Sequence, residues 1–416
     1  MTINILHTSD WHLGRQLYGQ KRYAEFEAFL DGLVANLSEH QIDVLLIAGD
    51  VFDTSTPSNQ AQNLYYNFLQ RVAGSSCRHV VVIGGNHDSP TFLDAPRSLL
   101  KALNVHVVGQ VADDPAEDVL LLRDADGLPE LIVCAIPYLR DRDLRTAGEN
   151  EALEDKDHQM LEGLQRIYAQ AGSAALKLRD QWGNHLPIIG MGHLFAAGGK
   201  VQEGDGVREL YVGSLAQVGR DVFPACFDYL ALGHLHVPQL LSGEEHLRYS
   251  GSPLAMGFGE ARQQKSLCKV SFDAKSNQPL KPQISLINIP SYQALEQIRG
   301  SMQVITQRIK ALKEQDQNIW LEVIHQDQAL VPNLRSELEA LVAGTQLQLL
   351  KITDQRVINQ VLQQQDIPKP LEELNPEDVF EHCLQQSDIA DEQRESLRHS
   401  FLFVMRKLAQ DDPLAE

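Results

Sequence analysis

Cysteine is scarce in this chain of 416 residues, and the few cysteines follow no metal-binding or disulfide spacing. The chain contains five, without a Cys-x-x-Cys pair: Cys77, Cys134, Cys226, Cys268 and Cys383. Such scattered single cysteines argue against a zinc ribbon and against a disulfide framework. They suit a reducing compartment, so we expect a cytoplasmic protein in which the cysteines are inert packing residues.

Long apolar runs are also absent. No stretch approaches the roughly 20 uninterrupted apolar residues of a membrane-spanning helix, so no membrane association is expected. The segment from Met1 to Asp10 has neither a basic start nor a long apolar run. We therefore expect no secretory signal peptide.

Basic residues are outnumbered. The chain has 36 Lys and Arg against 56 Asp and Glu, a formal net charge of −20. This counts against a simple nucleic-acid-binding protein, which usually has a basic surface. DNA is not excluded as a substrate, because bound metal ions or a partner can supply positive charge. The hydrophobic content of 43% is that of a globular protein, and the length predicts two or three domains.

Short apolar runs alternate with helical patterns over residues 1–280. The runs are rich in Val, Ile and Leu, as expected of strands that are buried on both faces. They cover residues 3–8, 44–48, 80–83, 105–108, 131–136, 188–191 and 229–232. Apolar residues recur at helical spacing over 26–37 and again over 64–72, where the stripe suits either the core or a dimer face. We predict a layered α/β domain over residues 1–280.

A smaller β/α set follows a polar, proline-containing boundary at residues 273–282. We expect a second domain over residues 281–360, with strands at 284–289, 319–324 and 347–352. Helices are expected at 302–312 and 334–342. This α+β region contains no chemical motif, which favours a lid or a substrate-binding domain.

The third region, residues 361–416, begins as a linker that contains three glutamines and two prolines. Asn375 followed by Pro376 and two acidic residues predicts the start of a helix. A second helix is expected around Leu397 and Phe401. Two short amphipathic helices cannot bury their apolar faces against each other alone. They must dock on this chain or on a partner.

Polar side chains that bind metal ions follow five of the predicted strands. They are Asp10, His12, Asp50, Asn86, His87, Asp88, His193, His234 and His236. In α/β sheets, functional sites assemble outside the carboxyl ends of the strands. Carboxylate, amide and imidazole ligands without a thiolate suit Mn, Fe or Zn.

The number of candidate ligands indicates two ions rather than one. Seven residues, namely Asp10, His12, Asp50, Asn86, His193, His234 and His236, are too many for one ion. Two ions that share a carboxylate would use them all. Ions about 3.5–4 Å apart clamp the attacking and leaving oxygens of an in-line displacement at phosphorus. Other histidines, such as His7, His79 and His106, are expected to be structural or exposed at the surface.

The order of these motifs resembles the calcineurin-like metallophosphoesterases. The shared pattern is Asp-x-His, Gly-Asp-x-x-Asp, Gly-Asn-His-Asp, Gly-His and Gly-His-x-His. Within that superfamily the chain is most similar to the SbcD family, in segments 7–14, 48–54, 85–89, 231–236 and 249–253. The resemblance extends to the second domain and the tail. It implies a β-sandwich flanked by helices, a small α+β capping domain and a C-terminal helical tail.

The resemblance also implies roles for individual residues. Asp50 would bridge two metal ions. One ion would be held by Asp10, His12, Asp50 and His236, and the other by Asn86, His193 and His234 with the bridging carboxylate. His87 would be the catalytic histidine, and Asp88 would orient it. Manganese is the metal that the family usually uses, with magnesium as an alternative.

The SbcD family is the nuclease half of a complex with SbcC, a coiled-coil ATPase, so ATP would be used by the partner and not by this chain. The resemblance implies an exonuclease on duplex DNA and an endonuclease on single strands and hairpins, in DNA end processing, recombination and repair. It also implies a homodimer within a heterotetramer, with the C-terminal helices on the ATPase. The alternatives are another metallophosphoesterase, such as a nucleotide phosphodiesterase or phosphatase, and a DNA-end scaffold with incidental nuclease activity.

Overall fold

The computed structural model describes residues 2–144, 153–183, 185–196, 218–273, 281–327 and 333–355, with a few single positions beyond. The chain divides into two compact units. The first comprises Met1–Gln297, Leu312–Glu322 and Gly344–Lys351, and it contains every candidate site residue. The second comprises Ile298–Ala311, Val323–Ala343 and Ile352–Glu416.

A six-stranded sheet, in the order β14-β13-β1-β4-β5-β6, forms one half of the first unit. Strands β1, β4, β5 and β6 are parallel, while β13 and β14 run antiparallel to their neighbours. The bounds are β1 Thr2–Thr8, β4 Val44–Ala48, β5 His79–Ile83, β6 Val105–Val108, β13 Ser266–Asp273 and β14 Gln283–Asn288. The runs predicted at 44–48 and 105–108 match β4 and β6.

A second six-stranded sheet has the order β11-β12-β10-β9-β8-β7. Its four central strands are parallel, and β11 and β7 are antiparallel edge strands. The bounds are β7 Val119–Arg123, β8 Pro129–Ala135, β9 Ile188–His193, β10 Tyr229–Gly233, β11 Gln239–Leu241 and β12 Glu244–Tyr249.

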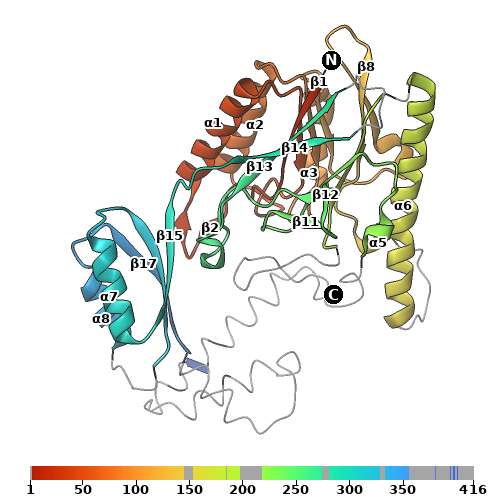
Figure 1. Cartoon of the computed structure of the whole chain (residues 1–416). Helices are drawn as coiled ribbons and strands as arrows, with labels where there is room; N and C mark the ends of the chain where they lie inside the picture. The colour runs from red at the N-terminus through yellow and green to blue at the C-terminus, as the bar shows by residue number, and fades with distance from the viewer. Residues whose placement is uncertain are drawn as a thin grey trace. The chain divides into compact units, whose positions relative to one another are not determined.

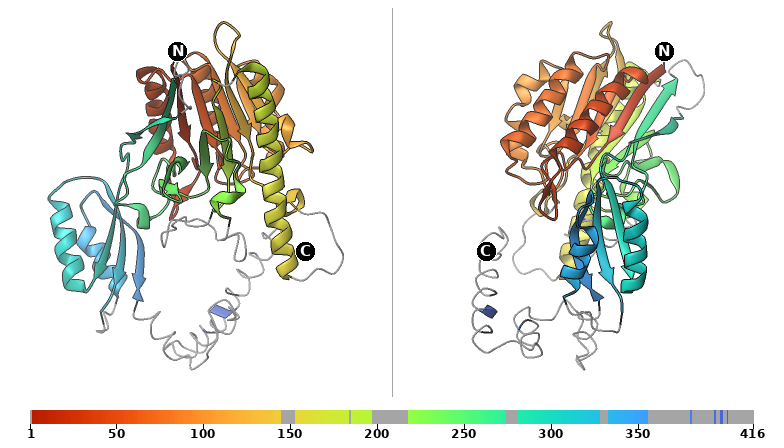
Figure 2. Two further views of the ribbon diagram at one scale, coloured as in Figure 1. Left: turned by 45° about the vertical axis from the view of Figure 1, so that its right-hand side comes forward. Right: turned by 90° about the vertical axis from the view of Figure 1, so that its left-hand side faces the viewer.

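The two sheets face each other and are covered by helices on their outer sides (Figures 1 and 2). Alternate residues of a strand point to opposite faces, so each strand contributes to two cores. Leu46 packs with Ile189 between the sheets, whereas its neighbour Leu45 packs with the helices outside. Helices α1 (Tyr23–Glu39) and α2 (Asn59–Ala73) cover the first sheet, and α6 (Leu153–Trp182) covers the second. The expected helix-flanked β-sandwich is confirmed.

Shorter elements complete the first unit. They are β2 Gln16–Leu17, β3 Gln20–Lys21, α3 Pro90–Asp94, α4 Arg97–Lys101, α5 Asp141–Leu144, and 3-10 helices η1 Pro115–Asp118, η3 Arg220–Val222 and η4 Phe258–Glu260. Strands β2 and β3 form a hairpin directly after the first metal-binding motif.

A three-stranded sheet, in the order β15-β16-β17, accompanies two further helices. The bounds are β15 Ala294–Gly300, α7 Met302–Lys313, β16 Ile319–His325, α8 Leu334–Val342 and β17 Leu347–Asp354. These elements match the helices predicted at 302–312 and 334–342 and two of the three predicted strands.

One predicted strand of the small domain belongs elsewhere. The segment predicted at 284–289 forms β14, which pairs with β13 and so extends the first sheet. The third strand of the small sheet is β15, where Glu296, Gln297 and Arg299 interrupt the apolar pattern and hide the strand in the sequence. The domain boundary expected at residue 280 therefore falls before the last strand of the large sheet.

The predicted tail over residues 361–416 lies outside the described residues, apart from single positions. Residues 197–217, which follow β9 and His193 in the chain, also lie outside the described residues. Within the described part of the chain, no helix is both long and apolar enough to cross a bilayer.

Candidate metal centre

The polar residues predicted from the sequence meet at the carboxyl ends of five strands. Asp10 and His12 follow β1, Asp50 follows β4, and Asn86 follows β5. In the second sheet, His193 ends β9, and His234 and His236 follow β10. Within each sheet these strands run parallel to one another. Their carboxyl ends therefore present these side chains at one edge of the sandwich.

One group of ligand atoms belongs to Asp10, His12 and His236, all of which are buried. Their ligand atoms lie within 4.8 Å of one another. Nε2 of His12 is 3.1 Å from Nε2 of His236 and 3.5 Å from Oδ2 of Asp50. Together with Asp50, these three residues are the four expected to hold the first metal ion.

A second group surrounds the other side of Asp50. Oδ2 of Asp50 is 3.3 Å from Nε2 of His193. The side-chain oxygen of Asn86 is 3.0 Å from Nε2 of His193 and 3.0 Å from Nδ1 of His234. Asp50 thus lies against ligands of both groups, and all seven predicted ligands are brought together.

The backbone at four of these ligands is in the left-handed region. The φ angles are 53° at Asp10, 47° at His12, 47° at Asp50 and 98° at His234. Positive φ at a residue other than glycine costs about 1–3 kcal/mol, and such residues cluster at functional sites. The sharp turns that they make after each strand place the side chains in the centre.

Glycines next to the ligands provide the space that the side chains occupy. A Cβ atom on Gly85 would lie 2.1 Å from Oδ1 of Asp50. A Cβ atom on Gly49 would lie 2.2 Å from Nδ1 of His193, and this glycine also has a φ of +88°. The glycines of the Gly-Asp and Gly-Asn-His-Asp motifs are therefore required by the packing of the centre.

Hydrogen bonds to backbone groups and to the Ser9 hydroxyl hold these side chains in place. The backbone N–H of His234 donates to Oδ1 of Asp10 at 2.9 Å, and the Ser9 hydroxyl donates to the other oxygen. Nδ1 of His193 donates to the carbonyl oxygen of Ala48 at 2.9 Å. That bond fixes the proton on Nδ1, so Nε2 is the nitrogen available to a metal ion.

His87 lies beside the cluster and is partly exposed. Its backbone N–H donates to Oδ1 of Asp50 at 2.9 Å, and its ring is 4.8 Å from the ring of His12. Its Nδ1 is 2.8 Å from the carbonyl oxygen of Asp53. The ring is thus oriented by a backbone carbonyl.

Asp88 has a different environment from the one expected. Its carboxylate accepts hydrogen bonds from the backbone N–H groups of Val51, Phe52 and Gly85 at 2.9–3.1 Å. Among the described residues, no hydrogen bond joins it to the ring of His87. Asp88 therefore fixes the two ligand loops to each other rather than orienting the imidazole. Burial, together with the charge of Asp50, raises the pKa of Asp88 to about 6.

Two carboxylates in contact with the ligands were not assigned from the sequence. Oδ1 of Asp53 is 3.3 Å from Nδ1 of His12 and 3.1 Å from the Arg15 guanidinium. The spacing Gly-Asp-x-x-Asp was the available signal for Asp53. Glu260 is fully buried, with Oε1 3.7 Å from Nδ1 of His236. Nothing in the local sequence distinguishes Glu260, because it lies 24 residues beyond its partner.

The buried carboxylate of Asp50 is held in its charged form by the histidines beside it. Burial disfavours the charged form of Asp50, but His193 and His12 outweigh it and hold the pKa of this carboxyl well below its usual range. Burial acts to lower the pKa of His193, but Asp50 raises it to about 9. Burial, together with the charge of His193, lowers the pKa of His234 to about 3. Carboxylate, amide and imidazole ligands around this negative charge fit two divalent cations.

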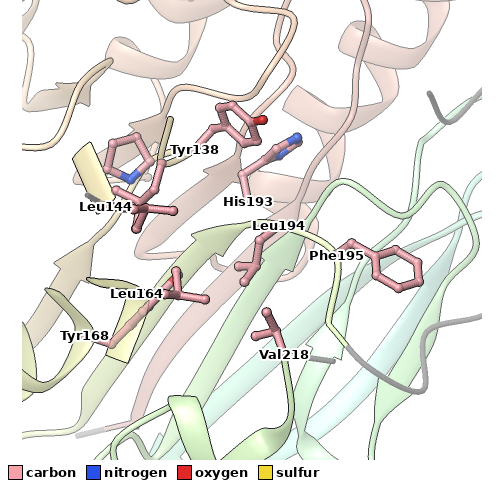
Figure 3. A pocket seen from close by; sticks show the side chains of 10 residues that line it. Tyr138, Leu144, Leu164, Tyr168, His193, Leu194, Phe195 and Val218 are labelled. Carbon is pink, nitrogen blue, oxygen red and sulfur yellow. The ribbon is translucent and has the colours of Figure 1, made fainter. Parts of the chain in front are cut away.

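An apolar cavity borders the centre at His193 (Figure 3). Leu164, Leu194 and Val218 line it, and Tyr138 packs edge-on against the His193 ring with centroids 6.3 Å apart. An apolar wall keeps the local dielectric constant low, which strengthens the attraction between the ligands and a cation.

The three histidines expected to be structural or exposed make contacts outside the metal centre. His7 is buried and 3.0 Å from the Tyr229 hydroxyl. His79 and His106 form a pair 3.4 Å apart. Trp11 is fully buried and packs edge-on against Phe68, beneath the first ligand loop.

Comparison with known proteins gives two family matches. Residues 3–238 match the calcineurin-like phosphoesterase family. Residues 291–388 match a family described as the type 5 capsule protein repressor C-terminal domain. A solved dimetal phosphatase from Danio rerio is also similar, at 11% identity and a TM-score of 0.37 over 69% of this chain and 99% of that chain.

Relatives named as subunits of a nuclease are more similar in sequence. The SbcD subunit of the nuclease SbcCD from Escherichia coli K12 is 33% identical over 409 residues, which cover 98% of this chain and 99% of the relative. The protein of the same name from Rhodobacter capsulatus is 38% identical over 62% of this chain and 64% of the relative. The one from Bacillus subtilis is 36% identical over 66% of each. With the metallophosphoesterase sandwich and all seven ligand positions in place, this chain belongs to the SbcD family of calcineurin-like phosphoesterases.

Proposed function

We propose that this chain is a metal-dependent DNA nuclease that acts with an SbcC-type ATPase in DNA end processing. The observation that carries the proposal is the position of Asp50, whose Oδ2 lies 3.5 Å from His12 and 3.3 Å from His193, ligands of two different groups. A carboxylate shared in this way is the arrangement that two-metal hydrolysis of a phosphodiester needs. The similarity to relatives named as components of a nuclease supports DNA as the substrate.

The centre would hold two divalent ions, with manganese as the proposed metal and magnesium as the alternative. Asp10, His12 and His236 would bind one ion, and Asn86, His193 and His234 the other, with Asp50 shared. When bound, the ions activate water and stabilise negative charge on the phosphate oxygens.

His87 is the proposed proton donor to the leaving sugar oxygen. Its Nδ1 is committed to the carbonyl of Asp53, so Nε2 is the nitrogen that exchanges a proton. The ring is partly exposed, as a group that meets the substrate must be. General acid catalysis of this kind contributes roughly 10²–10⁴-fold to the rate. Asp88 contributes indirectly, because it fixes the loop that carries His87.

The partner and the assembly are also proposals. The relatives are named as one component of SbcCD, which supports an SbcC-type partner. We propose that the helices predicted in residues 371–416 bind that ATPase, in a heterotetramer built on a dimer of this chain. The test deletes residues 371–416. Metal-dependent phosphodiesterase activity should persist while ATPase binding is lost; a truncated chain that fails to fold would show instead that the tail belongs to the core.

A reducing, cytoplasmic location stays a prediction from the sequence. The four described cysteines, Cys77, Cys134, Cys226 and Cys268, are free thiols, which agrees with it.

The experiment that tests the substrate class compares four substrates at equal metal concentration. Linear duplex DNA, a nucleoside monophosphate, a cyclic nucleotide and a phosphopeptide are each incubated with the protein and Mn²⁺. Cleavage of DNA alone supports the proposal. Turnover of a nucleotide or phosphopeptide without DNA cleavage, also in the presence of an SbcC-type ATPase and ATP, would favour the alternative of a phosphatase or nucleotide phosphodiesterase, which the net charge of −20 suits. Survival of DNA-end processing in cells that carry His87→Ala would favour a scaffold.

A further inference from the structure

A buried carboxylate faces one metal ligand from outside the centre. Glu260 ends the 3-10 helix η4 and is fully buried. Its Oε1 lies 3.7 Å from Nδ1 of His236 and has no hydrogen-bond partner within the described part of the chain. The other ring nitrogen of His236, Nε2, faces His12 at 3.1 Å. Glu260 is therefore on the side of the imidazole that faces away from the cluster.

The two oxygens of Glu260 have different surroundings. Oε2 accepts a hydrogen bond from the backbone N–H of Met256 at 3.2 Å, lies 3.5 Å from the Ser252 hydroxyl and pairs closely with the ammonium group of Lys265. These contacts anchor the carboxylate in the fold. They leave Oε1 facing the ring of His236, where a buried acceptor needs a donor.

Lys265 is the charge partner that makes this buried carboxylate tolerable. It is only 6% exposed. Its ammonium group also donates to the carbonyl oxygen of His236 at 2.9 Å and to the Ser252 hydroxyl at 3.1 Å. The same cation therefore holds both the backbone of the ligand and the carboxylate that faces its ring.

We propose that Glu260 is a positioning residue for the metal ligand His236, with Lys265 as its charge partner. An imidazole binds a metal ion through a nitrogen lone pair, so its proton must be on the other nitrogen. A carboxylate beside Nδ1 holds the proton there and keeps Nε2 available. Removing such a partner typically lowers metal affinity about 10–100-fold. The inference rests on the two-metal centre proposed above and adds a residue pair outside the phosphoesterase motifs.

Glutamine at position 260 separates this role from packing alone. Glu260→Gln keeps the size of the side chain. If its oxygen faces Lys265, its N–H group faces Nδ1 of His236 and favours the tautomer that cannot bind metal through Nε2. Glu25 offers a matched control, because it is also a buried carboxylate paired with a cation, Arg22, at 2.7 Å. Glu25 contacts none of the proposed ligands in the described hydrogen bonds and ion pairs.

The experiment titrates the metal-free full-length variants with Mn²⁺ and measures free Mn²⁺ by electron paramagnetic resonance. We expect Glu260→Gln to bind one of its two ions about 10–100-fold more weakly, and Glu25→Gln to bind both like the parent protein. Parent-like affinity for both ions in Glu260→Gln would overturn the proposal. The titration needs no DNA, so its failure is distinct from failure of the nuclease assignment.

Two further measurements separate the proposed role from loss of metal caused by unfolding of Glu260→Gln. The double variant Glu260→Gln, Lys265→Met deletes the unpaired buried charge. It should also bind one ion more weakly, because the carboxylate beside Nδ1 of His236 is gone. In the unaltered protein loaded with Zn²⁺, nitrogen-15 spectra of labelled histidine should show the His236 proton on Nδ1. A proton on Nε2 would overturn the proposal without any variant.

Discussion

The Nε2 atoms of His12 and His236 lie 3.1 Å apart, although 224 residues separate the two histidines in the chain. Neither nitrogen can accept from the other unless one carries a proton. His236 has its second nitrogen directed at a carboxylate, and Nδ1 of His12 is 3.3 Å from Oδ1 of Asp53. If both Nδ1 atoms carry the proton, both Nε2 lone pairs are available to the same cation.

Asp50→Asn should remove metal and activity together. The carboxylate is the group common to both ligand sets, and the amide removes the negative charge that both ions require. Metal content after dialysis, measured by mass spectrometry, should fall from two ions to one or none. Asp31→Asn, at an exposed carboxylate paired with Arg71, is the control and should keep both ions. Normal metal content in Asp50→Asn would contradict the shared role.

His87→Ala should keep both ions but lose most of the turnover. No ring atom of His87 belongs to the seven proposed ligands, and the expected fall in kcat is roughly 10²–10⁴-fold. The measurement pairs Mn²⁺ titration with steady-state cleavage of a small phosphodiester. His246→Ala, at a partly exposed histidine 3.4 Å from Glu244, is the control. A parallel loss of metal would make His87 a ligand instead.

Metal binding should release a proton from His193. The pKa of its imidazole in the metal-free protein is raised to about 9, whereas that of His12 is lowered and that of His234 is about 3. At pH 7 only His193 of these three is protonated, and it must lose that proton to bind metal. Affinity should therefore rise about tenfold per pH unit between pH 6 and 8.

Calorimetry of Mn²⁺ binding in two buffers with different ionisation enthalpies measures this proton. For about one proton released per protein, the two binding heats should differ by the difference between the ionisation enthalpies of the buffers. Equal heats in the two buffers would show that His193 is already neutral in the metal-free protein.

Two glycines with the same backbone conformation should respond differently to alanine. Gly49 and Gly19 have φ angles of +88° and +84°. At Gly19 the added methyl group meets open space, so only backbone strain of about 1–2 kcal/mol is expected. At Gly49 the methyl group would lie 2.2 Å from Nδ1 of His193, so Gly49→Ala should also displace that ligand and weaken metal binding. Equal metal affinity in the two variants would contradict this packing.

The sequence predicts the layered α/β domain and the polar residues that meet at its strand ends for a physical reason. Strands buried on both faces must be apolar throughout, so a polar residue such as Asp50 or His193 at the end of a run is conspicuous. The order of the motifs then predicts that strand ends far apart in the chain meet at one site. The same reasoning places the helices of the small domain, whose apolar faces repeat at helical spacing.

The parts that the sequence does not predict depend on pairing in three dimensions. β14 is an apolar strand, but only its hydrogen bonds to β13 assign it to the large sheet. Asp88 is adjacent to His87 in sequence, yet its carboxylate is turned towards backbone N–H groups of a different loop. Glu260 contacts a ligand across a turn that no motif marks. In each case the role depends on which strand or side chain the segment contacts in the fold, and not on the residue type.

The most direct test of the account is cleavage of labelled linear duplex and hairpin DNA by the purified full-length protein, with Mn²⁺, with Mg²⁺ and with a chelator, beside His87→Ala. Cutting should require the divalent metal and be strongest with Mn²⁺. It should be lost in His87→Ala, while that variant still binds two ions. Absence of cutting even with an SbcC-type ATPase and ATP, alongside turnover of a small phosphodiester, would contradict the nuclease assignment and leave a phosphoesterase of another substrate class.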